Sequence, residues 1–278
     1  MVITLAVALF GMIFGSFINA WVWRVHEVAF SHKPKKNSQK KLENLSVLTG
    51  RSICPQCRHV LATKDLVPVF SWIYLRGKCR YCHNVISLQY PAVELITAIL
   101  FGLSYYVMQP TNPESWALLT IWLAQIVVLV ALAVFDIRWM LLPNKILAIL
   151  SGLAGIGLFA EVFTYSSFQP LQSAMIASVL AGGLFYFVFA ISRGKWMGGG
   201  DVKLAFVMGL LLGIRDVGVA LMIGFATAAL VGVGLIALKR ISRKSLIPFG
   251  PFLILGTIIA GLWGEKIFQW YQNIVIIN

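Results

Sequence analysis

Two aspartates are the residues whose type and surroundings best suit acid–base chemistry. Asp136 stands in "AVFDIRWMLLPNK" and Asp201 in "MGGGDVKL", each beside a long apolar run. A carboxylate close to hydrocarbon is costly, and ionisable groups at such depth usually line a wet, functional cavity. If both enter one cavity, an ionised carboxylate can activate water while its protonated partner donates a proton to an amide. We assign Asp201 as the base, because a helix amino end favours its anion, and Asp136 as the acid.

Each aspartate also has a simpler interpretation. Asp136 could mark the point where a span meets the headgroups, paired with Arg138, and Asp201 could be a helix N-cap. Length argues against the simpler interpretation of Asp201. If Arg215 marks the outer interface, the 14 residues that separate them rise only ~21 Å, whereas a hydrocarbon core is ~30 Å thick. The carboxylate would then be recessed, and the preceding glycines would let a substrate approach the backbone closely.

A second candidate site is formed by cysteines. The chain has four cysteines, all within residues 24–90, as "CPQC" and "CRYC" with 21 residues between the two motifs: Cys54, Cys57, Cys79 and Cys82. Four thiolates at this spacing close the tetrahedral coordination sphere of a structural Zn²⁺. Two disulfides are the alternative, which a reducing cytosol disfavours, and His59 or His83 could each replace a thiol. We expect a zinc-stapled platform, because so few apolar side chains cannot build a core.

The elements that must hold these groups are membrane helices. Hydrophobic residues make up 59% of the chain and charged residues 12%, and the mean hydropathy is +0.84. A soluble domain could not hide so much apolar surface. Apolar runs near the ~18-residue spanning length recur as solid blocks, which excludes a transmembrane barrel. The first block, 1–23, has no charged side chain and no clear cleavage site, so we expect a permanent span.

The predicted fold is an all-α polytopic membrane protein with about eight transmembrane helices and a small zinc-stapled cytoplasmic loop domain. Its parts are a first transmembrane helix at 1–23, the loop at 24–90, and a seven-helix region at 91–278 that carries both aspartates. The expected spans lie near 2–23, 91–109, 116–135, 144–163, 172–192, 202–214, 217–238 and 249–270.

Basic residues predict the orientation. The net charge is +13, and 21 of the 23 Lys and Arg residues fall in 24–90 and in three short connections on the same side. Only Arg215 and Lys266 lie on the opposite side. The positive-inside rule therefore places the loop in the cytoplasm and both termini outside. Charge beside a membrane argues against nucleic acid as a partner; the Lys-rich segment 31–41 either contacts anionic lipid headgroups or is solvated and mobile.

The motifs, taken together, resemble the bacterial prepilin peptidases, also called type IV leader peptidases. "MGGGDVKL" resembles the GxGD signature of membrane aspartic proteases, with Gly198, Gly200 and Asp201 in its defined places. Further matching stretches occur in family order over nearly the whole chain: "GSFINAWVWR" (15–24), "SICPQC" (52–57), "SWIYLRGKCRYC" (71–82), "ISLQYPAVELITAILF" (86–101), "FDIRWMLLPN" (135–144) and "IPFGPFL" (247–253).

The resemblance implies that Asp136 and Asp201 are the catalytic pair, with Gly198, Gly200 and Lys203 in the active-site loop. The implied reaction removes the leader of type IV prepilins or pseudopilins, after a glycine, at the cytoplasmic face of the bacterial inner membrane. The enzyme would act on these substrates within membrane lipid.

Many family members also N-methylate the new amino terminus with S-adenosylmethionine, an activity linked to the N-terminal part that carries the cysteines. This chain retains all four cysteines and "GSFINAWVWR", so the resemblance favours a bifunctional enzyme. Within that stretch, four residues are motif positions without an assigned role: Gly15, Ser16, Asn19 and Arg24.

Two rival functions use the same residues differently. A proton- or cation-coupled transporter would use Asp136 and Asp201 as its ion site, and glycine breaks near intramembrane charge occur there too. The sequence has no internal inverted repeat, and a transporter leaves the set of motifs unexplained. A zinc-stapled scaffold without catalysis would need neither aspartate.

Overall fold

The computed structural model describes residues 1–30, 52–240, 242 and 246–276, and the chain divides into two compact units, 1–106 and 107–278. The Lys-rich segment 31–41 lies outside the described residues. Within the described part the fold is helical, with no strand longer than an isolated bridge. Seven helices are long and apolar enough to cross a membrane. The prediction of an all-α polytopic membrane protein is confirmed.

The first unit holds a pair of antiparallel helices, α1 (Val2–Phe30) and α4 (Gln89–Met108). Glycines on α1 set how closely the two approach: a Cβ on Gly11 would lie 2.7 Å from Phe101 Cβ, and one on Gly15 would lie 2.5 Å from Glu94 Cα. Small residues allow such approach in lipid, where helix association depends on van der Waals contact. Two short helices lie between α1 and α4 in sequence, η1 (Thr63–Asp65) and α3 (Phe70–Tyr74).

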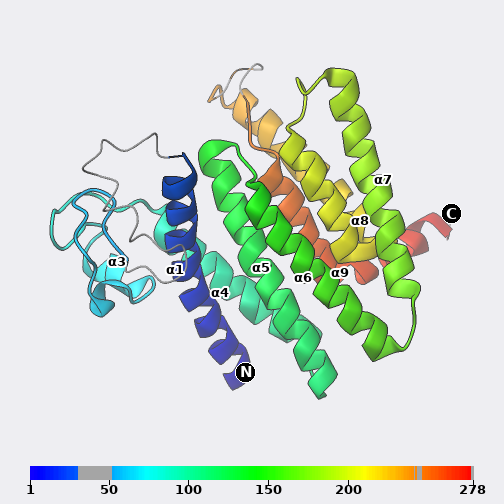
Figure 1. The fold of residues 1–278 in the computed structure, drawn as a ribbon, viewed down its shortest axis with the longest axis horizontal. Coiled ribbons are helices and arrows are strands. Elements are labelled where there is room, and N and C mark those ends of the chain that lie inside the picture. The colour runs from blue at the N-terminus through cyan, green and yellow to red at the C-terminus, as the bar shows by residue number, and fades with distance from the viewer. Residues whose placement is uncertain (31–51, 241, 243–245, 277–278) are drawn as a thin grey trace. The chain divides into compact units, whose positions relative to one another are not determined.

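The second unit is a helical bundle (Figure 1). Its helices are α5 (Pro113–Trp139), α6 (Asn144–Tyr165), α7 (Gln169–Ser192), α8 (Gly199–Ala237) and α9 (Gly250–Ile276). The start of α5 shows how sequence sets a boundary, because Asn112 accepts a hydrogen bond from Ser115 N–H at 2.8 Å and Pro113 follows it. The middle of α5 is the core of the bundle, with Ile126 and Leu129 fully buried.

Helix α8 accounts for the difference between eight expected spans and seven continuous helices. Its 39 residues contain both spans expected at 202–214 and 217–238. A straight helix of that length would measure ~58 Å, about twice the hydrocarbon thickness. Gly213 interrupts it with φ 70° and ψ −178°, a conformation open essentially to glycine alone.

The chain reverses direction at Gly213. Before it, α8 runs antiparallel to α7, since Phe206 meets Gly182 and Gly213 meets Ser173. After it, α8 runs antiparallel to α9, since close contacts pair Ala220 with Gly256 and Asp216 with Gly264.

Helices α7 and α9 are themselves antiparallel. The Phe185 ring, near the carboxyl end of α7, stacks at 6.3 Å on that of Phe249, at the amino end of α9. The two halves of α8 are therefore a helical hairpin that supplies two spans.

Replacing Gly213 by alanine should destabilise the bundle by about 1–3 kcal/mol, because the residue has a positive φ and a glycine-only ψ. The new Cβ would also lie 2.8 Å from Ser173 Oγ, which accepts a hydrogen bond from Ile214 N–H. Thermal unfolding in detergent measures the effect. Gly218→Ala is the matched control, because a Cβ there meets nothing within 4 Å. Equal stability of the two variants would contradict the hairpin at Gly213.

Candidate active site and cysteine centre

Asp136 lies in the last turn of α5 and is 5% exposed. The helix ends just after it, where Met140 takes φ 51° and donates its N–H to the Asp136 carbonyl at 2.8 Å. The carboxylate accepts a buried hydrogen bond at Oδ2 from the Gly250 backbone N–H, at 2.9 Å. This bond joins the end of α5 to the start of α9.

Gly250 is a site residue to which sequence reasoning gave no role. A Cβ at this position would lie 2.6 Å from Asp136 Oδ2, so no other residue fits without displacing the carboxylate. The preceding Phe249 is held in an aromatic cluster, with ring centroids 5.3 Å from Phe225 and 6.3 Å from Phe185. The available signal was the stretch "IPFGPFL", which contains Gly250.

Asp201 lies in the first turn of α8 and is partly exposed. The expectation that it could be the N-cap is wrong, because Gly198 occupies that position in an extended conformation, with ψ 146°. Asp201 is instead the third helical residue, and its carboxylate forms a hydrogen bond with the Gly198 backbone. This is the return half of a capping box, and the negative charge lies near the helix amino end.

The two aspartates come together at one end of the bundle. The start of α8 lies against the connection between α5 and α6, where a Cβ on Gly200 would be 3.0 Å from Leu142 Cβ. Lys203 Nζ donates to Asn144 Oδ1 at 2.7 Å across the same junction. The Asp136 and Asp201 carboxyl groups lie near enough for their charges to interact.

The residues expected in an active-site loop have a different local structure. Gly198 is the N-cap of α8, and Gly200 and Lys203 are in its first two turns. The cause is the capping by Asp201, which lets the helix begin directly after the glycines.

The four cysteines of the first unit form one cluster. Their sulfur atoms all lie within 4.8 Å of one another, and Cys54 Sγ is 3.9 Å from Cys82 Sγ. A tetrahedral Zn²⁺ with bonds of ~2.3 Å separates its sulfur ligands by about 3.8 Å. The cluster is therefore consistent with a zinc site.

Both cysteine motifs have the same local backbone. In the first, Cys54 N–H donates to His59 O at 3.0 Å and Arg58 N–H donates to Cys54 O at 2.9 Å. In the second, the equivalent bonds join Cys79 N–H to Asn84 O and His83 N–H to Cys79 O, both at 2.9 Å. Arg58 and His83, each just after the second cysteine of a motif, take φ 59° and 57°. The sequence thus forms two matching turns that aim four thiols at one point.

The thiols differ in acidity. Burial raises the pKa of Cys54, but hydrogen bonds from the Cys57 and Gln56 backbone outweigh it and lower the pKa to about 7. A backbone hydrogen bond from Asn84 lowers the pKa of Cys82, yet burial and the neighbouring thiols raise it to about 11. One thiolate forms readily, whereas four together require a cation.

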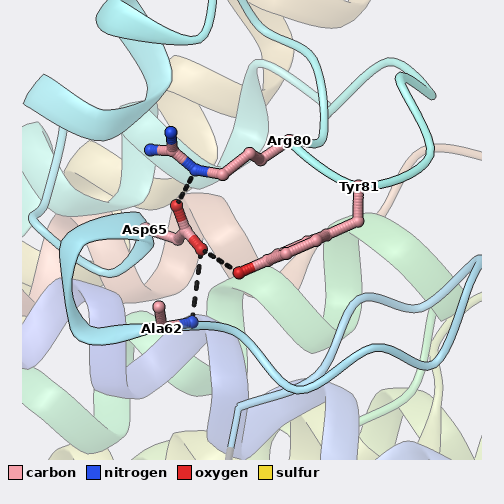
Figure 2. A network of polar contacts seen from close by, with 4 residues as sticks. All are labelled: Ala62, Asp65, Arg80 and Tyr81. Carbon is pink, nitrogen blue, oxygen red and sulfur yellow. Dashed lines mark hydrogen bonds and ion pairs between the residues drawn. The ribbon is translucent and has the colours of Figure 1, made fainter.

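A polar network ties η1 to the second cysteine motif (Figure 2). Asp65, whose side chain is 3% exposed, accepts a hydrogen bond from Arg80 Nε at 2.7 Å. It also accepts from Tyr81 Oη at 3.1 Å and from Ala62 N–H at 3.2 Å. Burial raises the pKa of Asp65, but these hydrogen bonds and the Arg80 charge outweigh burial and hold it below its usual range. The Tyr81 ring also stacks on His59, with centroids 3.7 Å apart, which joins the two motifs.

The four motif residues of α1 lie on or beside its contact with α4. Gly15 touches the Glu94 backbone, and Ser16 forms a hydrogen bond with the Glu94 carboxylate. Asn19 Nδ2 donates to Tyr90 O at 3.0 Å, while its Oδ1 is buried without a partner. Arg24 is also buried, at 5% exposure.

Glu94 was missed as a site residue by sequence reasoning. It is 7% exposed, and its Oε2 accepts the Val69 N–H at 2.7 Å, so it joins α4 to the segment that leads into α3.

These features define a class. The described residues form an all-helical, multi-pass membrane protein with two aspartates at one end of a bundle, and the separate first unit holds four clustered cysteines that are consistent with a zinc site. Residues 9–108 match the family model for the bacterial peptidase A24 N-terminal domain, and residues 123–233 match that of the type IV leader peptidase family. The chain belongs to the type IV leader peptidase family.

Several relatives are similar over nearly their whole length. The prepilin leader peptidase/N-methyltransferase of Aeromonas salmonicida (strain A449) is 34% identical, over 97% of this chain and 94% of the relative. The protein of the same name from Bacillus subtilis (strain 168) is 34% identical, over 84% and 90%. That of Pseudomonas aeruginosa is 29% identical, over 96% and 92%. No solved structure matches the chain. The family resemblance drawn from the motifs is confirmed.

Replacing Asp65 by asparagine should loosen the cysteine unit, because it removes the charge that holds Arg80 and Tyr81. Since the pKa of Asp65 is lowered in the folded state, its stabilisation is present above the ordinary pKa of ~3.9. It is lost as pH falls through the lowered folded pKa. We expect amide hydrogen exchange over 54–85 to be about tenfold faster in Asp65→Asn at pH 7. The two proteins should converge as the pH falls from about 4 through the lowered folded pKa.

Lys64→Gln is the control for this comparison, because Lys64 is an exposed neighbour in the same short helix. A difference between wild type and Asp65→Asn that persists unchanged in acid would contradict the role of the carboxylate charge.

Proposed function

We propose that this chain removes the leader peptide of type IV prepilins or pseudopilins and then methylates the new amino terminus. The main support is that the chain belongs to the type IV leader peptidase family, and that relatives similar over nearly their whole length are named prepilin leader peptidase/N-methyltransferase. Asp136 and Asp201 at one end of the bundle support an aspartic mechanism for the first reaction. The family assignment does not favour a transporter.

In the proposed cleavage, one carboxylate acts as base and the other as acid. Asp201, whose anion is stabilised by the α8 amino end, takes a proton from water as the water oxygen attacks the scissile carbonyl carbon. Asp136 is 5% exposed and gives its proton to the carbonyl oxygen. Its Oδ2 accepts the Gly250 N–H, which leaves Oδ1 to carry that proton. As the tetrahedral intermediate collapses, Asp136 takes back a proton from a hydroxyl of the intermediate, and Asp201 gives its proton to the leaving nitrogen. The C–N bond then breaks, which releases the pilin with a free amine and restores both carboxyl groups.

The orientation proposed from charge places this site at the cytoplasmic face of the bacterial inner membrane, with both termini outside. Seven of the nine described basic residues of the second unit gather at the aspartate end: Arg138, Lys145, Arg193, Lys195, Lys203, Lys239 and Arg240. Arg215 and Lys266 flank the contact between Asp216 and Gly264 at the other end. Basic residues near the cytoplasmic surface also favour contact with anionic lipid headgroups.

For the second reaction, S-adenosylmethionine would supply the methyl group, and the N-terminal unit with its cysteine cluster would support the transfer. The chemistry of the four sulfur ligands and their spacing fit Zn²⁺ in a closed, structural site. The metal would hold the two cysteine turns together, since the segment has few buried apolar side chains of its own.

Each of Asp136→Asn and Asp201→Asn should lower leader cleavage by about 10³-fold or more, because each removes a group that carries a proton in the reaction. Asparagine preserves the shape of the side chain, so the fold should persist. Cleavage of a purified prepilin in detergent, with thermal unfolding in parallel, measures both quantities.

Asp216→Asn is the control, since Asp216 is an acidic residue at the opposite end of the same bundle. Normal cleavage by either Asp136→Asn or Asp201→Asn would exclude the aspartic mechanism.

Cys79→Ser should lower bound zinc from about one equivalent per chain to near none, since it opens the closed ligand sphere. Methyl transfer should fall by about tenfold or more while leader cleavage persists. Metal analysis and the mass of the processed pilin amino terminus give the two measurements. His83→Asn should keep its zinc, because asparagine tolerates the φ of 57° and His83 is not among the clustered ligands. Full methyl transfer by a zinc-free protein would refute the coupling.

A further inference from the structure

An open groove of about 670 Å³ lies on the second unit between α6, α7 and α8. Its walls include Asn144 from α6, Val179, Gly183 and Tyr186 from α7, and Lys203 and Phe206 from α8. Val179 and Tyr186 are 61% and 62% exposed. All three helices are long and apolar enough to span a membrane, so much of the groove faces lipid.

The groove has the dimensions and the surface that a helix requires. Its residues on α7 run from 179 to 186, which corresponds to ~10 Å, or about two helical turns. Gly182 and Gly183 lie side by side on this wall, and a Cβ on Gly183 would meet nothing within 4 Å. Small residues on an exposed helix face let a second helix approach closely in lipid.

One end of the groove lies at the proposed catalytic site. Val202 and Lys203, which directly follow Asp201, line it, and Lys203 Nζ is fixed by Asn144 Oδ1 at 2.7 Å. The groove residues of α8, at 202, 203, 206 and 207, occupy one face of the helix, and at ~100° per residue Asp201 lies on nearly the opposite face. A helix in the groove therefore ends at the level of Asp201, and the chain that precedes it must pass around the amino end of α8 to reach the carboxylates.

The amino end of α8 carries no bulky side chain between the groove and Asp201. Gly198 and Gly199, at the amino end of α8, are exposed and present no side chain. An extended segment that continues from a docked helix can cross the helix end there and reach Asp201. The glycines also allow the close backbone approach that this crossing needs.

We propose that this groove docks the apolar helix of the prepilin, the segment that directly follows the scissile bond. The proposal rests on the proposed function and specifies where its substrate binds. A prepilin has a short leader followed by an apolar helix. That helix would lie in the apolar groove, and the bond before it would come to the level of Asp201, because the α8 wall of the groove begins at Val202. Lipid alone or a second copy of the chain would give the groove no relation to catalysis.

The first test fills the groove. Gly183→Leu places its Cβ where no atom of the protein lies within 4 Å, so the fold should be retained. We expect KM for a full-length prepilin to rise about tenfold or more with little change in kcat, as expected for lost binding. A synthetic peptide that spans the cleavage junction but ends before the apolar helix should be cleaved as well as by wild type. Gly218→Leu, at another exposed glycine with no neighbour within 4 Å, should behave as wild type on both substrates.

Three results would overturn the proposal: unchanged prepilin kinetics in Gly183→Leu, an equal loss on prepilin and peptide, or the same loss in Gly218→Leu. Failure of the proposed function has a different signature, in which wild-type protein cleaves neither substrate.

The second test identifies the occupant. A photoreactive phenylalanine analogue replaces Tyr186 in the groove or Leu184 on the other side of α7, both in an Asp201→Asn background that retains the substrate. Illumination with prepilin should give a crosslink to the pilin helix from position 186 and little from 184. Crosslinks from 186 only to lipid, or only to a second copy, would refute the assignment.

Discussion

The hydrogen bond from the Gly250 backbone N–H provides a partner for Asp136, the most buried of the described acidic residues in the bundle. Asp136 is 5% exposed, and its neighbours on α5 include the fully buried Phe135 and Leu132. A buried polar group without a hydrogen-bond partner costs about 1–3 kcal/mol. The first N–H groups of a helix have no partner within the helix, so the start of α9 supplies a donor that would otherwise be unsatisfied. The hydrogen bond therefore satisfies both the Asp136 side chain and a free N–H at the start of α9. A glycine is required at position 250 because any Cβ would occupy the space of the Asp136 oxygen.

The same solution recurs at Asp201, where the carboxylate and the Gly198 backbone close the start of α8. Two helix amino ends thus meet the two aspartates at one end of the bundle, and each carboxyl group forms a hydrogen bond with the backbone there. Glycine also sets the close approach of the helices that carry them. Gly209 lies against Ser178 of α7, and Gly256 of α9 lies against Ala220. Apolar bulk at these positions would separate the helices and disturb the paired carboxylates.

The sequence predicted features that depend on composition and on residue spacing. The membrane helices follow from apolar blocks, and the cysteine cluster follows from two CxxC motifs whose turns repeat the same hydrogen bonds. Asp201 remained one candidate for the N-cap of α8, and Gly198 takes that position instead, because Asp and Gly both favour caps and only the backbone shows which of them is extended. Gly250 was missed since its role depends on a contact across 114 residues of sequence. The groove could not be predicted from the sequence, because it depends on how three helices lie relative to one another and no short stretch of residues encodes it.

If Asp136 and Asp201 are the catalytic pair, as proposed, their location bears on how a membrane-embedded substrate is cut. Peptide bonds within a helix are closed to attack, because their carbonyls are hydrogen-bonded and surrounded by side chains. Asp136 is in the last turn of α5 and Asp201 in the first turn of α8, so the pair lies at the end of the bundle and not at its middle. A bond that precedes a helix can reach this position without unwinding. The arrangement therefore suits a substrate whose scissile bond lies just outside its apolar helix, and it needs water only near the membrane surface, where water is available.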